Sequence, residues 1–486
     1  MRKPYEPQQR LDLPPIVEVD LNFNCRHEIV PILKALQHIY SQPELRDSIL
    51  DAIGKDVNGE SDASRGRRGL YYWEILVLVA VRLGCNLDYD ALQDLAENHR
   101  ALRQVMGIGD WEDRRSFDWR RIRDNVTKIR PETLKRINEL VVAAGHELVP
   151  EAAEAVRADT FVAETNIHYP TESSLIRDGL RKVLSLCVAI AAILGLSGWR
   201  QHKHLERKVR KLAAKIDRLA RRKSSGSEVA MQRRYRELLG LARTLLSRAA
   251  VREAIALQGK GDPELEAMDR ELEIFMERTR QVCETARRRV LEGEAVPNGE
   301  KLFSIFEPHT QLYKRGKVAE PVQFGRLVLV YEDSVGFVVG YSILAREAHE
   351  RDVVVARTAE LQERLGGKME RLSLDRGFHW PENQEALAEI VEHPCLPASG
   401  SKQAAEQERE SSVEFRRSRK RHPGIESAIH ALQSGNGLER CRDRTEPGFA
   451  RYIGLGVLGR NLHVLGKLLI DQEARGSPAA LSRRVA

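Results

Sequence analysis

The chain has 486 residues, of which 42% are hydrophobic and 31% charged, so the composition predicts a folded protein of roughly two to four domains. Its 78 lysines and arginines exceed its 71 acids by only seven, an excess that favours a polyanionic partner only where it is clustered. The six cysteines form no C-x-x-C pair, which excludes a disulfide framework and a zinc site as first interpretations. The N-terminus lacks the apolar core of a signal peptide, and the longest apolar run, 183–196, is too short to span a bilayer. We therefore expect a cytoplasmic protein with no membrane partner.

Residues 1–150 are predicted to form an all-helical N-terminal domain. The apolar stretch YYWEILVLVAVRLG predicts a helix that ends with a C-terminal cap at Gly84, and Asp88 is the expected N-cap of the next helix. A segment with six arginines follows, and it includes Arg120 and Arg121. Two helices around a turn and then a basic helix can be a helix-turn-helix DNA-binding unit, in which these two arginines contact DNA. A plain helical bundle with solvated arginines fits the same residues.

The pattern changes at residues 151–171, where AVRADTFVAETNIHY is rich in β-branched residues and predicts a strand. Residues 172–300 return to helical spacing, and SSGSE and QGKGDPE divide them into about three helices, a hairpin or small bundle. One predicted helix carries apolar residues at alternating steps of four and three, which indicates a packed seam: Leu205, Val209, Leu212, Ile216 and Leu219.

The same helical region contains a dense basic block between Trp199 and Lys223. Eleven lysines and arginines there face two acids, a local net charge of +9. A solvated helix face explains the block. Phosphate contact, with Lys208 and Lys211 among the contacting residues, explains it as well, since so many like charges repel one another unless an anion relieves them.

Residues 301–474 are predicted to alternate strands and helices. KLFSIFEP, FGRLVLVYED and GFVVGYSIL predict three strands, and the last two are joined by a turn at Asp333. A helix, the strand ERLSLD, a second helix and the short strand HPCLPAS follow. A polar, flexible stretch is expected at 399–415, before two final helices. Helices inside a series of strands predict an α/β core that is interrupted by the helical insertion.

Three carboxylates in this core are candidates for chemistry. Asp159 lies in the first strand, Asp375 ends a later strand, and Glu426 lies on a late helix. If they converge, their oxygens suit two Mg²⁺ or Mn²⁺ ions that act on a phosphodiester. Each acid also has an ordinary explanation, as a strand or turn residue, an Asx turn before Gly377, and a first-turn helix glutamate.

Four blocks of the sequence resemble DDE transposases of bacterial insertion sequences, in the group called ISNCY. The blocks are DTFVAETNIHYPTESSLIRDG, SIFEPHTQLYKRGK, LSLDRGFHWPENQ and HPGIESAIHALQSGNGLERC, in the order of the family. The resemblance implies a ribonuclease-H-like mixed sheet core with Asp159, Asp375 and Glu426 as the catalytic, metal-binding triad. It also implies two divalent ions and the cutting and joining of double-stranded DNA at terminal inverted repeats. A homodimer in the synaptic complex, associated with the nucleoid, is the expected assembly.

The sequence departs from the family around its last acid. Relatives often carry Tyr, two residues, Arg, three residues, Glu, six residues and Lys, whereas this chain has Arg419, His422, Glu426 and Gln433. Three neighbouring cations keep the local charge and are expected to neutralise DNA phosphates: Arg417, Lys420 and Arg421. Two other functions remain compatible with the sequence. One is a ribonuclease-H-like nuclease that cuts without joining, and the other is a transposase-derived DNA-binding protein without catalysis.

Overall fold

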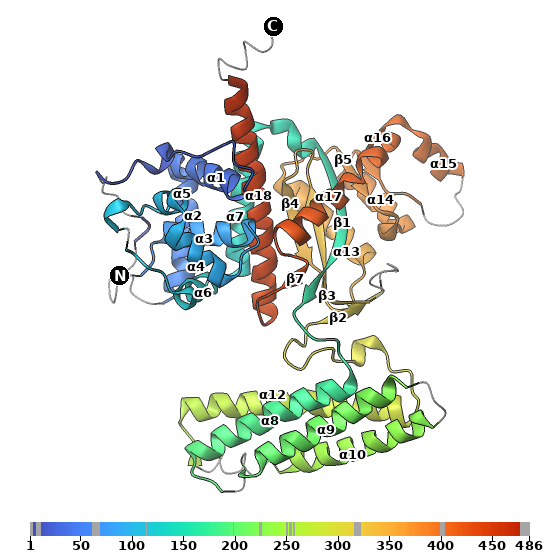
Figure 1. The fold of residues 1–486 in the computed structure, drawn as a ribbon. Helices are drawn as coiled ribbons and strands as arrows, with labels where there is room; N and C mark the ends of the chain where they lie inside the picture. Colours follow the sequence, from blue (N-terminus) through green and yellow to red (C-terminus); the bar gives the residue numbers. More distant parts are fainter. Residues whose placement is uncertain are drawn as a thin grey trace. The chain divides into compact units, whose positions relative to one another are not determined.

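A computed structural model describes residues 3–5, 11–60, 69–112, 114–197, 199–222, 226–248, 251, 255, 258–314, 322–398 and 404–476 (Figure 1). The chain divides into two compact units, residues 1–164 with 326–486, and residues 165–325. The fold is mixed α/β and mostly helical, with an all-helical N-terminal region before a mixed sheet, so the predicted class is confirmed at this level.

In the part of the N-terminal region that the structure describes, there are seven α-helices. They are α1 (Ile29–Ser41), α2 (Pro43–Asn58), α3 (Tyr72–Gly84), α4 (Tyr89–Asn98), α5 (Arg100–Val105), α6 (Trp119–Val126) and α7 (Pro131–Leu148). The predicted N-cap of α4 is confirmed, since the Asp88 carboxylate accepts a hydrogen bond of 2.8 Å from the Ala91 N–H. Helix α3 is buried along its whole length. These helices share their core with the distant C-terminal helix α18 (Glu446–Gly476), which packs against α1, α3 and α7.

Gly84 does not act as the predicted helix cap. It is the last residue of α3, and the left-handed conformation in the following turn belongs to Asn86, with φ of 53°. Gly84 instead lies where α3 crosses α18, because a Cβ on Gly459 would lie 2.6 Å from the Gly84 nitrogen. A Cβ on Gly466 would likewise overlap the Pro31 carbonyl oxygen of α1. Glycine is therefore required at these positions by close helix packing rather than by turn geometry.

The sheet contains parallel and antiparallel strands. They are β1 (Ala155–Thr165), β2 (Gln311–Tyr313), β3 (Gln323–Glu332), β4 (Val338–Ile343), β5 (Arg371–Leu374), β6 (His393–Cys395) and β7 (Arg440–Cys441). The strand order is β2-β3-β1-β5-β6, with β4 paired to β3 and β7 to β1. Strands β1, β5 and β6 run parallel, whereas β3 and β4 are antiparallel. Asp333 accepts three backbone hydrogen bonds in the β3–β4 turn, which confirms the predicted hairpin there.

Helices between and after the strands complete this unit. Helix α13 (Glu350–Arg364) follows β4, and α14 (Pro381–Ile390) connects β5 to β6. Three short helices come next: α15 (Ala404–Ser411), α16 (Val413–Arg421) and α17 (Gly424–His430). The predicted flexible stretch 399–415 is thus wrong from residue 404 onward, and its first five residues lie outside the described residues. Helix α16 is anchored by the buried Phe415. This apolar residue does not stand out in the sequence because most of its neighbours are charged.

The predicted strand KLFSIFEP is also wrong. Residues 301–308 form no strand, because Leu302 and Ile305 are buried in the hydrophobic core of the helical unit. The Ser304 hydroxyl accepts hydrogen bonds from the N–H groups of Phe306 and Glu307, which holds a tight turn. Burial of the apolar side chains among helices therefore outweighs their β-propensity.

The described residues of the unit at 165–325 form four long helices where about three were predicted. They are α8 (Glu172–Ile193), α9 (His202–Ala220), α10 (Ser227–Ser247) and α12 (Pro263–Ala286), and they lie side by side in Figure 1. The missed break lies between α8 and α9, where Gly195 has a φ of 63°. Of the predicted seam, Val209, Leu212 and Ile216 are buried, and Leu205 and Leu219 are half-buried.

Helix α18 is, within the described part of the chain, the one helix that is long and apolar enough to cross a membrane. However, 67% of its most apolar window is buried inside the protein. Its apolar residues include Tyr452, Ile453 and Leu462, each fully buried. Burial of this extent is typical of a helix in the core of a folded protein.

Candidate active site

The strand register brings Asp159 and Asp375 next to each other. Strands β1 and β5 are paired in parallel, and the last aligned pair is Ala158 with Leu374. Asp159 is the next residue of β1 and Asp375 is the first residue after β5, so the register brings them to neighbouring positions where the pairing ends. Ala158 and Leu374 are buried, and because side chains alternate along a strand, both aspartates are on the opposite face. Asp159 is half-buried and Asp375 is exposed.

Helix α16 ends over this face of the sheet. Arg157 Nη1 donates a hydrogen bond of 3.2 Å to the Arg421 carbonyl oxygen, and Ser373 Oγ lies 3.2 Å from His422 Nδ1. Arg157 and Ser373 are themselves register partners, two residues before the aspartates. Arg419 of the same helix reaches the aspartate pair, with Nη1 3.8 Å from Asp375 Oδ1. The end of α16 therefore places one cation, Arg419, beside Asp375.

His422 occupies the position where the family that the sequence resembles often has arginine. The side chain of His422 is buried, and this burial lowers the pKa of its imidazole. The charge of Arg419 lowers the pKa further, whereas the charge of Asp375 raises it. The lowered pKa favours the neutral imidazole, which packs against Ser373.

Glu426 lies on α17, and contacts at Gly424 and Gln433 hold this helix and the turn after it against β1. At one end of this segment, a Cβ on Gly424 would overlap the Arg157 guanidinium, and at the other end Gln433 Nε2 donates to the Val162 carbonyl oxygen at 3.5 Å. These two anchors bracket Asp159 along the strand, and Glu426 is exposed between them. Among the described residues, however, no group of three or more His, Cys, Asp or Glu side chains could hold a metal ion as placed. The structure thus brings the two aspartates together and does not add Glu426 to them as a ligand set.

A fourth carboxylate, Glu350, was missed by the sequence analysis. It begins α13, and its Oε1 accepts a hydrogen bond from the Thr160 hydroxyl. A Cβ on Gly377 would lie 3.0 Å from its Oε2, so Glu350 also reaches the loop that follows Asp375. Thr160 is the residue after Asp159 on β1, so its side chain points to the opposite face of the sheet. An acid in the first turn of a helix is too common to be recognised from sequence as part of a site.

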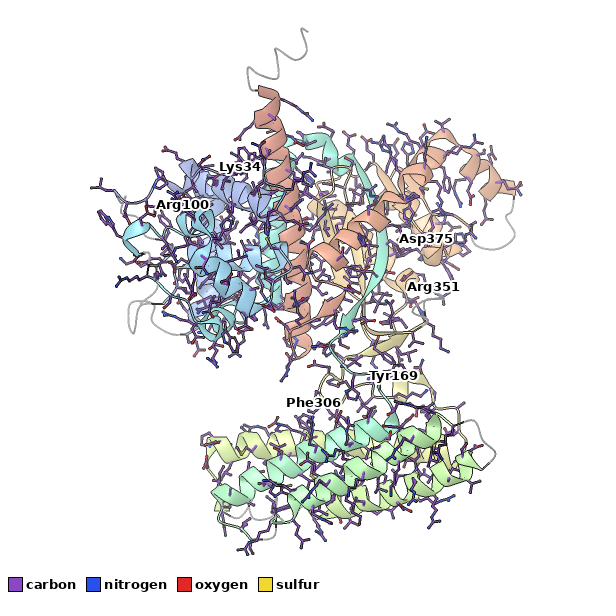
Figure 2. The ribbon with its side chains drawn as sticks, viewed as in Figure 1. Lys34, Arg100, Tyr169, Phe306, Arg351 and Asp375 are labelled. Atoms are coloured by element: carbon purple, nitrogen blue, oxygen red, sulfur yellow. The ribbon has the colours of Figure 1, made fainter. Side chains whose placement is uncertain are left out.

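An aromatic surface lies just after β5. The Arg351 guanidinium lies 4.5 Å from the centroid of the Trp380 ring, and Trp380 is 44% exposed. Asn383 Nδ2 donates to the carbonyl oxygens of Arg351 and Phe378, which fixes the loop after the strand. Figure 2 shows Arg351 and Asp375 in the same part of this unit. A flat cation–aromatic pair of this kind can stack an unpaired nucleobase.

The N-terminal basic helix exposes its arginines. Arg120 and Arg121 are exposed on α6, and the Arg120 guanidinium stacks on the Trp119 ring at 4.8 Å. The opposite side of α6 buries Ile122 and Val126. DNA contact by Arg120 and Arg121 stays a prediction. Because α18 completes the core of α1, α3 and α7, binding by this region is best measured in the full chain.

The basic stripe of α9 is also exposed, and it has a direct test. Lys208, Arg210, Lys211 and Lys215 are all exposed, while Val209 between them is buried in the helical core. Replacing the four cations with glutamine should leave the far-ultraviolet circular dichroism unchanged, since the seam is untouched. The log–log salt slope of DNA binding should fall by up to about 0.9 per lost phosphate contact.

A matched control for that variant exchanges lysine for arginine and arginine for lysine at the same four positions. It keeps the charges, so its salt slope should equal that of the wild type. An unchanged slope in the glutamine variant would show that the stripe is a solvated face.

Two adjacent aspartates, an arginine beside them and a helix that carries a third acid along the same strand form the candidate site. Comparison of the chain with known protein families, with curated proteins and with solved structures finds no match.

Proposed function

We propose that this protein is a DNA transposase that cuts and joins phosphodiester bonds at the ends of an insertion sequence. The observation that carries the proposal is the register of β1 and β5, which sets Asp159 beside Asp375 on one sheet face. Two carboxylates held at neighbouring strand positions suit hard divalent cations, which prefer oxygen ligands. The four sequence blocks that resemble DDE transposases add to this support.

The architecture is compatible with a ribonuclease-H-like core. The sheet is mixed, β1 pairs in parallel with β5, and β5 with β6. A helical unit enters the chain directly after β1 and returns it to β3. An insertion at this point leaves the β1–β5 pairing intact, since both aligned segments belong to the other unit.

Each charged residue of the candidate site has its own role in the proposed reaction. Asp159 and Asp375 would hold Mg²⁺ or Mn²⁺, with Glu426 as the third carboxylate of the proposed site. Two such ions, when bound, supply electrostatic stabilisation of the attacking and leaving oxygens. Arg419, 3.8 Å from Asp375, offsets the negative charge of the aspartate pair and can donate to a phosphate oxygen. Glu426 is exposed on its helix. The proposal requires its side chain to adopt a rotamer that points toward the aspartates.

A DNA-binding protein without catalysis is the second candidate function. It is favoured by the absence, among the described residues, of a group of three or more potential ligands as placed. The exposed arginines of α6 and the cations of α9 and α16 would serve such a protein equally well.

One assay separates the candidate functions. The purified full chain is incubated with Mg²⁺ and labelled DNA that carries both flanks of its own reading frame, and with a scrambled duplex of equal length. The proposal expects joined products from the flanking DNA alone. Cut ends without joining would identify a nuclease. A shifted band without any cleavage, with Mn²⁺ as well as Mg²⁺, would contradict catalysis and identify a binding protein.

A further inference from the structure

An arginine-lined pocket lies on the same sheet face as the aspartate pair. Its volume is about 470 Å³, and four separate segments line it: the start of β1, the β3–β4 turn, β5 and α16. It is lined by four arginines and three serines, which are Arg157, Arg371, Arg417, Arg421, Ser334, Ser373 and Ser418. Lining groups from four segments make this a built cavity within one compact unit rather than a single charged helix surface.

The acids around the pocket leave it positive. Asp333 lines it, but Oδ1 of Asp333 accepts from three backbone N–H groups of its turn and Oδ2 lies 2.9 Å from His146 Nε2. Arg157 is paired with the buried Glu332 at 2.6 Å, and Glu332 is also 3.8 Å from Arg460. Two cations therefore share that one buried carboxylate.

The remaining arginines differ in how they are compensated. Arg371 lies 3.4 Å from Glu154 and 3.8 Å from Glu370, two ion pairs at the partly exposed rim. Arg417 and Arg421 are exposed, and the described part of the chain offers neither of them an ion pair within 4.0 Å. Two guanidinium groups without an ion pair among the described residues match a phosphate, whose oxygens accept bidentate hydrogen bonds from arginine.

The position of the pocket identifies the source of the phosphate. Arg157 and Ser373 line it, and each lies two residues before an aspartate of the pair on the same strand face. Two strand residues span about 7 Å. A nucleic-acid backbone carries a phosphate at every nucleotide, so a strand with one phosphate at the aspartates brings another to this pocket.

We propose that this arginine pocket binds a backbone phosphate of the DNA strand that is cut, adjacent to the phosphate at Asp159 and Asp375. The inference rests on the proposed function and specifies how the substrate lies. The strand crosses the sheet face from the pocket to the aspartates, beneath the end of α16. Arg157 and Arg371 fix the floor of this subsite, and Arg417 and Arg421 close it from the helix.

The test uses the full chain and two probes. The variant Arg417→Gln/Arg421→Gln is compared with wild type and with Arg416→Gln, an exposed residue of the same helix that does not line the pocket. In calorimetry at low ionic strength, the double variant should bind inorganic phosphate about tenfold more weakly or worse, since hydrogen bonds to charged groups are lost. The Arg416→Gln variant should bind phosphate as the wild type does. In a salt series with duplex DNA, the log–log slope of the double variant should fall by about 1.8, for two lost contacts.

The possible outcomes test phosphate binding in the pocket independently of the proposed transposase activity. Unchanged phosphate affinity and an unchanged slope in the double variant overturn the inference, even if the wild type cuts and joins DNA. Loss of phosphate binding with an unchanged slope also overturns it, because the pocket is then a small-anion site. Loss of both in a protein that neither cuts nor joins DNA supports the pocket and contradicts the transposase. The variant Arg417→Lys/Arg421→Lys keeps the charges and should retain most of the slope, which excludes misfolding as the cause.

Discussion

Asparagine in place of Asp159 or Asp375 is expected to abolish cutting and joining while the affinity for DNA stays nearly unchanged. Asparagine has the shape of aspartate, but it removes one anionic ligand from the pair that the β1–β5 register sets together. The expected loss of cleavage rate exceeds about 100-fold, since groups that merely support a metal ligand already contribute 10–100-fold. DNA affinity depends mainly on lysine and arginine contacts to phosphate, which these changes leave in place. Cleavage rates and gel-shift affinities of the same preparations measure both effects.

The matched control for this experiment is Glu164→Gln on the same strand. Glu164 pairs with Arg440 at 2.8 Å near the other end of β1, away from the aspartates. This variant should cut and join DNA at close to the wild-type rate. An Asp159→Asn or Asp375→Asn protein that cuts as fast as the control would remove that residue from the proposed site.

Alanine at Gly466 is expected to destabilise the protein, although alanine favours a helix over glycine. Gly466 lies in α18, where the added Cβ would overlap the Pro31 carbonyl oxygen of α1. The obstacle is backbone, which cannot rotate away as a side chain can, so the two helices must separate. Overpacking of this kind costs about 1–3 kcal/mol, a sizeable share of the stability of a typical protein. Urea unfolding followed by circular dichroism measures the change.

The same substitution at Gly448 provides the comparison. Gly448 lies in the first turn of α18, and the atoms nearest to a Cβ added there, on Arg451 and Thr445, would be 3.4 Å away. Gly448→Ala should therefore leave the unfolding midpoint unchanged or raise it. Equal midpoints for the two alanine variants would show that α1 and α18 do not pack as closely as described.

Local signals allowed much of the fold to be predicted. The β-branched run around Asp159 and the apolar run before Asp375 form β1 and β5, and the Asp88 cap stands where the spacing predicts it. The pairing of β1 with β5 could not be derived from these signals, since parallel register depends on contacts between segments far apart in sequence. Both aspartates were predicted from their positions on strands and from the resemblance to a family, and the register shows how they come together.

The errors have a shared physical cause. KLFSIFEP has the composition of a strand, but Leu302 and Ile305 are buried among helices instead. Gly84 has the position of a helix cap, but its missing side chain serves the crossing with α18. In both cases a tertiary contact with a distant segment decides the role of the residue. Glu350 was missed for the same reason, and of the arginine pocket only Arg417 and Arg421 were predicted, because the other lining residues come from distant strands.

The most direct test of the account asks whether Asp375 contacts a divalent metal ion while DNA is cut. The variant Asp375→Cys replaces a hard oxygen ligand with a soft sulfur, which binds Mg²⁺ poorly and binds Mn²⁺ better. Cleavage of the flanking DNA by this variant should be lost in Mg²⁺ and partly restored in Mn²⁺, whereas Asp375→Ala should stay inactive in both. The account would be contradicted if Asp375→Cys cut DNA normally in Mg²⁺, or if the two variants were equally active in every metal.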